Sequence, residues 1–274
     1  MHVTLASTAV ICTAYRRPDY FRQVLASWQA ARGIGDIRSF TLALGWHEEK
    51  AFADHLAEFG AFRQATGLGT ERGRLRIDHS AARRANGMHH ALGEAGNHVF
   101  ADPAVEFTVF GEEDIIVSSD ALELMAWGKE TFADDPRVLC VCAHNPGAQG
   151  WDRREPMDDA GADQSAVRLH ATFNSWGWGI WRDRWERVMS LGWDWSCNLG
   201  GPTTSGYDWR LLSIVRANGY LCALPDASRS QNIGQHGGWA ANPADFPLTQ
   251  AQSFRADRPG PVAYRLVEAE ERAA

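Results

Sequence analysis

Three consecutive carboxylates, Glu112, Glu113 and Asp114, follow an apolar stretch, residues 105–110, that is predicted to be a buried strand. The carboxyl ends of parallel strands are where α/β folds bind their ligands. Adjacent carboxylates repel one another, and a divalent cation that prefers oxygen ligands, Mn²⁺ or Mg²⁺, would relieve this repulsion and could bridge to a diphosphate. The alternative is a solvated acidic turn that begins the next helix, because Asp and Glu favour helix N-termini.

Another carboxylate, Asp208, stands between two aromatic residues, Tyr207 and Trp209. Loss of hydration between aromatic neighbours raises the pKa of a carboxyl group towards neutrality, which suits a general base. The alternative is that Asp208 caps a helix expected over residues 209–218. Both interpretations remain open from this segment alone.

Arginine and tryptophan residues supply further candidates for ligand contacts. A cluster of arginines could hold a phosphate through charge-assisted hydrogen bonds, although a solvated arginine surface is the commoner outcome; it consists of Arg72, Arg74, Arg76, Arg83 and Arg84. Tryptophan faces could stack on a sugar, although most of the twelve tryptophans are expected in the core. The glycine-rich segment 230–238 is either a lid or a flexible connector.

Several nucleotide and hydrolase motifs are missing or imperfect. Residues 67–73 nearly imitate a dinucleotide fingerprint, but the glycine spacing is wrong. The sequence contains no GxSxG elbow and no GxxxxGK[ST] phosphate loop. The adjacent His89 and His90 are more typical of one buried and one exposed helix residue than of a metal pair. The acidic cluster is therefore the strongest sign of chemistry.

Alternating strands and helices are expected to position these residues. Strands are predicted at 8–15, 39–45, 105–110 and 138–142, and helices at 18–31, 47–59, 80–94, 119–132 and 209–218. Residues 66–78 are expected to be irregular, and 146–166 to form a long loop. This alternation predicts an α/β fold with a mostly parallel central sheet flanked by helices. No linker divides the chain, so a single domain is expected, with halves at about 1–115 and 116–255 and a frayed charged tail at 256–274.

Bulk composition excludes several classes of protein. The chain has 274 residues, 22% of them charged, and a net charge of −7, which disfavours a nucleic-acid partner. Five cysteines without metal-ribbon spacing are expected to be buried, reduced thiols. No signal peptide and no membrane-spanning run is evident, so a cytoplasmic location is expected. The preference for arginine over lysine is typical of a high-GC bacterium.

The order of these motifs resembles the inverting β-1,2-N-acetylglucosaminyltransferases, the family that includes N-acetylglucosaminyltransferase I and the protein O-mannose enzyme. The resemblance covers roughly residues 8–240. It comprises the turn Ile11 to Arg17, the helix end Met88 to Leu92, the acidic motif with residues 115–120, the segment Ser175 to Gly179, the pair Asp208-Trp209, and the segment Ser228 to Gly237.

The resemblance implies a GT-A fold, a nucleotide-sugar donor held through a divalent cation, and inversion at the anomeric carbon. It implies that Asp114 contacts the metal and that Asp208 is the catalytic base. The donor-binding residues expected from the resemblance and the arginine cluster are Tyr15, Arg16, Arg83, Arg84, Glu112, Glu113, Trp178, Asn232 and His236. The family triplet is usually Glu-Asp-Asp, whereas Glu113 occupies its middle position here.

The function predicted from the sequence is metal-dependent transfer of a sugar from a nucleoside diphosphate to an acceptor hydroxyl, and the resemblance suggests N-acetylglucosamine as the sugar and UDP as the nucleoside diphosphate. A sugar nucleotidyltransferase is the first alternative, although Tyr15 to Pro18 is not the glycine-rich loop typical of that class. A non-catalytic carbohydrate-binding protein is the second, although it would not need an acidic cluster at a sheet edge.

Overall fold

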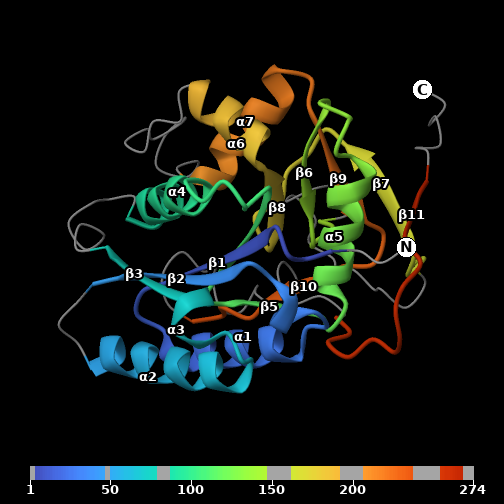
Figure 1. The fold of residues 1–274 in the computed structure, drawn as a ribbon. Coiled ribbons are helices and arrows are strands. Elements are labelled where there is room, and N and C mark those ends of the chain that lie inside the picture. The colour runs from blue at the N-terminus through green and yellow to red at the C-terminus, as the bar shows by residue number, and fades with distance from the viewer. Residues whose placement is uncertain are drawn as a thin grey trace.

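The computed structural model describes residues 4–46, 50–78, 87–146, 162–191, 206–236 and 254–267. Within these ranges a nine-stranded sheet lies between two layers of helices (Figure 1). The strands are β1 (Thr8–Ala14), β2 (Ser39–Gly45), β3 (Gly73–Asp78), β4 (Phe107–Glu112), β6 (Val138–Cys142), β7 (Ala166–His170), β8 (Trp178–Trp181), β9 (Leu221–Pro225) and β11 (Arg265–Leu266). The α/β fold with a mostly parallel central sheet flanked by helices is confirmed.

The strand order is β11-β7-β9-β6-β8-β4-β1-β2-β3. The four strands β3, β2, β1 and β4 are mutually parallel, and β8 runs antiparallel between β4 and β6. The carboxyl ends of the four parallel strands therefore meet at one edge of the sheet. The central strands β1 and β2 are buried along their whole length, as expected for parallel strands covered on both faces.

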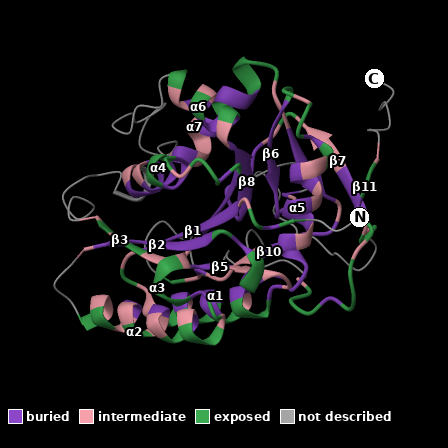
Figure 2. Cartoon of the chain, viewed as in Figure 1, coloured by how far each residue is buried: buried purple, intermediate pink, exposed green. Residues whose placement is uncertain are grey.

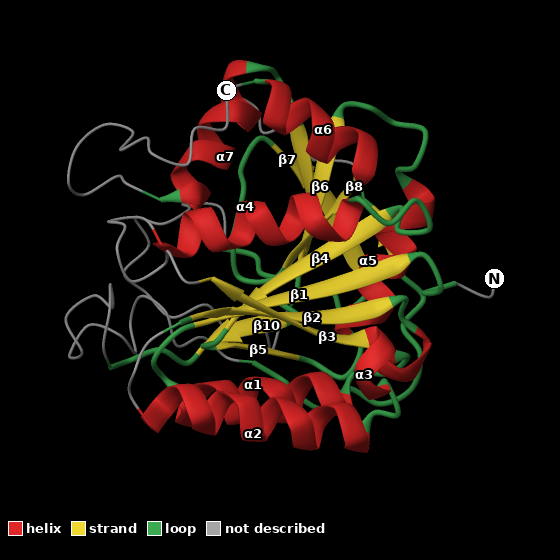
Figure 3. Ribbon diagram, turned by 60° about the vertical axis from the view of Figure 1, so that its left-hand side comes forward, coloured by secondary structure: helices red, strands yellow, loops and turns green. Residues whose placement is uncertain are grey.

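Helices cover both faces of this sheet (Figure 3). One core packs α1 (Pro18–Ala30), α2 (Lys50–Ala65) and α5 (Ala121–Thr131) against one face. The other core packs α4 (Gly87–Phe100), α6 (Arg182–Ser190) and α7 (Tyr207–Ala217) against the opposite face. The burial pattern in Figure 2 follows this layering, with buried strands between helices that expose their outer sides.

Helix α1 shows how local sequence produces one of these elements. Pro18 is compatible with the first turn, where its missing N–H has no partner to lose. The predicted apolar stripe is buried and consists of Phe21, Val24, Leu25 and Trp28. The helix ends before Gly33, whose φ of 85° requires glycine, and a Cβ there would lie 2.4 Å from Leu5 Cδ1.

Several boundaries match the sequence predictions, and two predictions are wrong. The predicted strands 39–45 and 138–142 coincide with β2 and β6. The stretch 66–78, expected to be irregular, contains α3 (Gly69–Arg72) and the edge strand β3. On this edge strand Leu75 and Ile77 are 41% and 37% exposed while Arg74 and Arg76 are half-buried, so the segment has no buried apolar face that would mark it as a strand.

The tail is packed where it was expected to fray. The Ser119 N–H donates to the Ala256 carbonyl at 2.8 Å, Arg258 is buried, and β11 pairs with β7. The expected frayed tail is therefore wrong for residues 256–267, which close the far edge of the sheet. No helix in the described part of the chain is long and apolar enough to cross a bilayer.

Candidate active site

The acidic cluster lies at the carboxyl edge of the sheet, between β4 and a short strand, β5 (Ile115–Val117). Glu112 is the last residue of β4 and pairs in register with Thr13 of β1, so the cluster stands beside the turn that follows β1. Glu113 is 3% exposed and Asp114 is 7% exposed. The alternative interpretation, a solvated acidic turn that begins a helix, is wrong because Glu113 and Asp114 are buried, Glu112 is half-buried, and a strand follows them.

Glu113 points inward and holds the β1–α1 turn. Its Oε1 accepts from Arg17 Nε at 2.7 Å, and its Oε2 accepts from the Tyr15 N–H at 2.7 Å and lies 3.4 Å from His55 Nε2. Burial opposes ionisation, but the hydrogen bond from His55, the charge of Arg17 and the Tyr15 N–H outweigh it and lower the Glu113 pKa to about 2. We assign Glu113 a positioning role, because both of its oxygens accept hydrogen bonds from the turn between β1 and α1.

Asp114 is held in place from two sides. Arg17 Nη1 lies 2.9 Å from Asp114 Oδ2. On the other side, a Cβ added to Gly234 would lie 2.1 Å from the same oxygen, so only glycine allows this segment to approach so closely. Burial raises the pKa of Asp114, and the charge of Arg17 opposes that shift.

Glu112 shares its surroundings with a residue 95 positions further along the chain. The Tyr207 hydroxyl donates to Glu112 Oε1. Burial, followed by the negative charge of Asp114, raises the Glu112 pKa to about 8, and the Tyr207 hydrogen bond opposes the shift. Glu112 and Asp114 therefore oppose each other's ionisation in a desolvated site, and with a pKa of about 8 Glu112 keeps its proton near neutral pH unless a further positive charge is supplied.

Asp208 joins this group from the start of α7. The helix begins at Tyr207 with Gly206 as its N-cap, so Asp208 is in the first turn and is not the cap itself. Burial raises the Asp208 pKa, and backbone N–H groups of Asp208 and Trp209 oppose the rise. Asp208 follows Tyr207, whose hydroxyl donates to Glu112, so the two carboxylates lie in one region, and the charge of Asp208 helps to raise the Glu112 pKa. The desolvated carboxylate expected of a general base is therefore present.

The segment 230–236 crosses the acidic cluster. Strand β10 (Ser230–Asn232) pairs antiparallel with β5, and the Ile233 N–H donates to the Asp114 carbonyl at 2.8 Å. Asn232 Oδ1 accepts from the Gly234 N–H at 2.7 Å, which shapes the turn. The N–H of the exposed His236 donates to the Tyr20 hydroxyl at 3.0 Å. Asn232 and His236 thus lie on the segment beside Asp114, while residues 237–238 fall outside the described ranges.

Other predicted donor contacts have mixed outcomes. Tyr15 and the exposed Arg16 follow β1 at the acidic edge, and the Arg16 guanidinium lies 4.7 Å from the Tyr15 ring centre. Trp178 is 0% exposed and stacks on Phe110 at 4.4 Å, so its indole is part of the core and has no face open to a donor. Arg83 and Arg84 lie outside the described residues.

Arg72 and Arg74, before and at the start of β3, do not serve this site, and Arg76, further along the strand, lies 3.4 Å from Glu94 Oε2 of α4. Arg72 donates to the carbonyls of Gly35, Ile37 and Gly67, and with Arg74 it lines a hollow of about 350 Å³. That hollow lies at the amino ends of the strands, across the sheet from the carboxylates. Because Arg72 is bound to backbone carbonyls, the predicted phosphate role is not supported for it.

Two groups at the acidic edge were missed from the sequence. Arg17 was noted as part of a turn, but its bonds to Glu113 and Asp114 depend on a contact across about 96 residues. Asp78 ends β3 and its Oδ2 lies 3.2 Å from His90 Nδ1. The position of an Asp at a strand end was a usable signal, but the strand itself had not been predicted.

The residues present fit a divalent cation with oxygen ligands. Arg17 is shared between Glu113 and Asp114, and its charge offsets only part of the shift that burial and Asp114 impose on the Glu112 pKa. A cation beside these two carboxylates would stabilise both ionised forms, and carboxylate oxygens suit Mn²⁺ or Mg²⁺. Glu112 and Asp114 are therefore the candidate ligands.

The similarity of this chain to known proteins is confined to solved structures. No protein-family model and no curated protein matches the sequence. Among solved structures, the chain is similar to TarS from S. aureus, with a TM-score of 0.48 and 10% identity over 88% of this chain and 62% of that one. It is also similar to the mannosyltransferase PcManGT from Pyrobaculum calidifontis, in complex with GDP-Man and Mn²⁺, with a TM-score of 0.48 and 17% identity over 88% of this chain and 68% of that one.

This chain thus spans less than two thirds of the TarS structure. At this level of similarity, the residues of the site have to carry the functional argument. The N-acetylglucosaminyltransferase family, the UDP donor and the inverting mechanism stay predictions.

Proposed function

We propose that the protein is a metal-dependent glycosyltransferase of the GT-A type that moves a sugar from a nucleoside diphosphate to an acceptor hydroxyl with inversion. The observation that supports this proposal most strongly is that Glu112, Asp114 and Asp208 come together at the carboxyl edge of a parallel sheet. These carboxylates come from segments about 95 residues apart, and each is desolvated. A core that needed only stability would not gather like charges there.

Glu112 and Asp114 would hold Mn²⁺ or Mg²⁺, which when bound supplies positive charge to a departing diphosphate. Arg17 fixes the Asp114 carboxylate, and the close approach of Gly234 limits its movement. Tyr15 and Arg16 lie beside the cluster as candidate donor contacts. Asp78, at the end of β3, and its partner His90 of α4 are candidate hydrogen-bonding groups for the nucleoside.

Asp208 is the proposed general base. Its raised pKa matches the task of taking a proton from the acceptor hydroxyl as that oxygen attacks the anomeric carbon. A single base and no enzyme nucleophile produce inversion, since the sugar is displaced once. N-acetylglucosamine and UDP are the donor components that the sequence resemblance favours.

The first test is a thermal-shift panel of nucleoside diphosphates and their sugars, including UDP-N-acetylglucosamine and GDP-mannose, with Mn²⁺, Mg²⁺ or EDTA. A ligand at about 100 times its Kd should stabilise the protein by about 2.7 kcal/mol, and only with metal. An equal shift in EDTA would remove the metal from the proposal.

The second test separates the carboxylates. Asp208→Asn keeps the shape but cannot accept a proton, so donor binding should persist while transfer falls about 10²- to 10⁴-fold. Asp114→Asn should instead lose metal-dependent donor binding. Asp183→Asn, an exposed aspartate in the first turn of α6, is the matched control. Wild-type transfer by Asp208→Asn would place the base elsewhere.

A further inference from the structure

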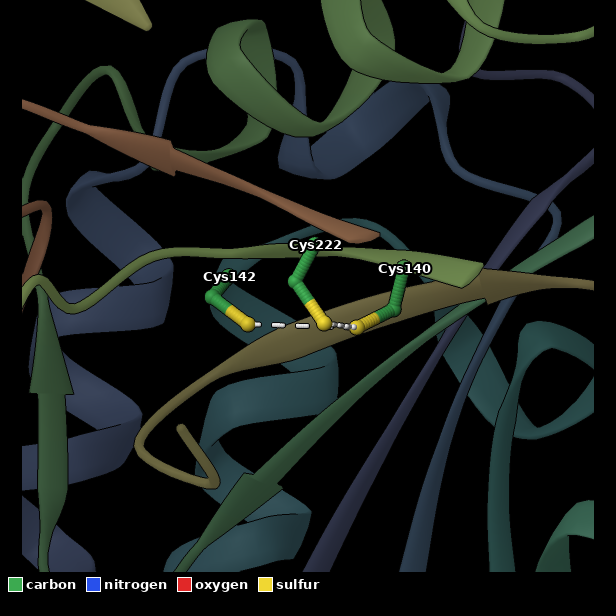
Figure 4. Close-up of side chains that lie close together, drawn as sticks. All are labelled: Cys140, Cys142 and Cys222. Carbon is green, nitrogen blue, oxygen red and sulfur yellow. Dashed lines mark hydrogen bonds between the residues drawn. The ribbon is translucent and has the colours of Figure 1, made fainter. Parts of the chain in front are cut away.

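A cluster of three thiols lies in the second half of the sheet, apart from the carboxylates. Cys140 and Cys142 come from β6 and Cys222 comes from β9 (Figure 4). Cys140 Sγ lies 3.3 Å from Cys222 Sγ and 3.9 Å from Cys142 Sγ. All three sulfur atoms lie within 4.8 Å of one another, and each residue is at most 1% exposed.

The strand register places these thiols together. Cys140 and Cys222 are direct partners on parallel strands, and Cys142, two residues on, points to the same face as Cys140. His170 of β7 is the register partner of Cys222, so it continues the same row on a third strand, where it is half-buried. The backbone N–H of Asn174 donates to Cys142 Sγ. The sheet therefore positions the thiols without help from a loop.

The sulfur spacing matches that around a metal ion. With Zn–S bonds of about 2.3 Å, neighbouring sulfur atoms in a tetrahedral or trigonal site are about 3.8–4.0 Å apart. The separations of 3.3 and 3.9 Å approach this value, so small side-chain rotations would complete it. The N–H of Asn174 directed at Cys142 is the kind of outer hydrogen bond that supports a thiolate ligand.

We propose that Cys140, Cys142 and Cys222 bind a thiophilic metal ion, Zn²⁺ in its simplest form, with His170 in the same row as the candidate fourth ligand. Thiolate ligands select zinc or copper(I), whereas the carboxylates of the candidate active site select Mn²⁺ or Mg²⁺. The two sites therefore take different metals. By joining β6 to β9, the bound ion would stabilise the sheet beneath α6 and α7.

The test uses the full chain, reduced, stripped of metal and kept free of oxygen. It is titrated with Co²⁺, which reports zinc sites through its spectrum. Saturation at a single ion per chain should produce a near-ultraviolet sulfur-to-cobalt charge-transfer band that Zn²⁺ then removes. Cobalt bound to the carboxylates gives no such band, so the readout is specific to the thiols.

Cys222→Ser should abolish the band, and Cys12→Ser, which changes a buried thiol of β1 in the other core, should keep it. The proposal is overturned if the wild-type protein shows no sulfur-to-cobalt band, or if Cys222→Ser retains it. If Cys222→Ser does not fold, Cys142→Ala replaces it, and the wild-type spectrum alone remains decisive.

Discussion

Gly234→Ala should damage the candidate active site without removing any group that does chemistry. The new Cβ would lie 2.1 Å from Asp114 Oδ2 and 3.0 Å from Arg17 Nη1. Ordinary contact begins at 3.4 Å, so the methyl group and the carboxylate must separate by about 1.3 Å. A displacement of about 1 Å in a catalytic group can cost about 100-fold in rate, or about 2.7 kcal/mol. We expect a loss of that size in transfer, with weaker metal-dependent donor binding.

The assay compares Mn²⁺-dependent donor binding by calorimetry with the initial rate of transfer or donor hydrolysis. Gly60→Ala is the control, because Gly60 lies in α2 with nothing within 4 Å of its added Cβ. That change should leave binding intact and add up to about 1 kcal/mol of helix stability. If Gly234→Ala binds donor and transfers sugar like the wild type, Asp114 is not constrained as described, and its assignment as a metal ligand fails with it.

Two further predictions concern stability. Arg229 and Asp120 form a fully buried ion pair at 2.8 Å, so Arg229→Met should cost about 3–5 kcal/mol in urea unfolding. Arg137→Met, at an exposed pair, should cost far less, and equal costs would contradict the pairing. Burial lowers the His144 pKa to about 4 from 6.5, against the opposing hydrogen bond to a backbone carbonyl. Between these values only the unfolded state binds the proton, so stability is present above pH 6.5 and is lost as pH falls to 4, by up to about 1.4 kcal/mol per pH unit. His144→Asn should flatten that slope in pH-dependent unfolding, the exposed control His98→Asn should not, and an unchanged slope in His144→Asn would disprove the assignment.

The elements that could be predicted are those whose burial is indicated by the local spacing of apolar residues. The strand β2 is a continuous apolar run, and the apolar stripe of α1 repeats every three or four residues. The sequence of each element alone therefore indicates which of its side chains are buried. The strand β3 could not be recognised this way, because an edge strand alternates charged and apolar residues and is defined by its partner, β2. The packing of the tail could not be predicted for the same reason, since the buried Arg258 is in contact with Ser119, which lies over a hundred residues away in the sequence.

The candidate site divides in a similar way. The acidic cluster and Asp208 were identified from residue type and position, and the structure brings both to one edge of the sheet. Trp178 was a wrong inference, because an aromatic residue in a Gly-rich segment can face either a ligand or the core, and the pairing of β8 between β4 and β6 turns it inward. That pairing depends on strands that are distant in the sequence.

The three adjacent carboxylates show most clearly where local reasoning ends. In the sequence Glu112, Glu113 and Asp114 are nearly equivalent, yet their pKa values move in different directions. Glu113 is hydrogen-bonded to Arg17 and becomes an internal anchor, whereas Glu112 accepts from the Tyr207 hydroxyl and is opposed by the charges of Asp114 and Asp208. The need for a cation in the proposed site therefore falls on positions 112 and 114. It is a property of the neighbours that the fold supplies, because three carboxylates each paired with an arginine would need no metal.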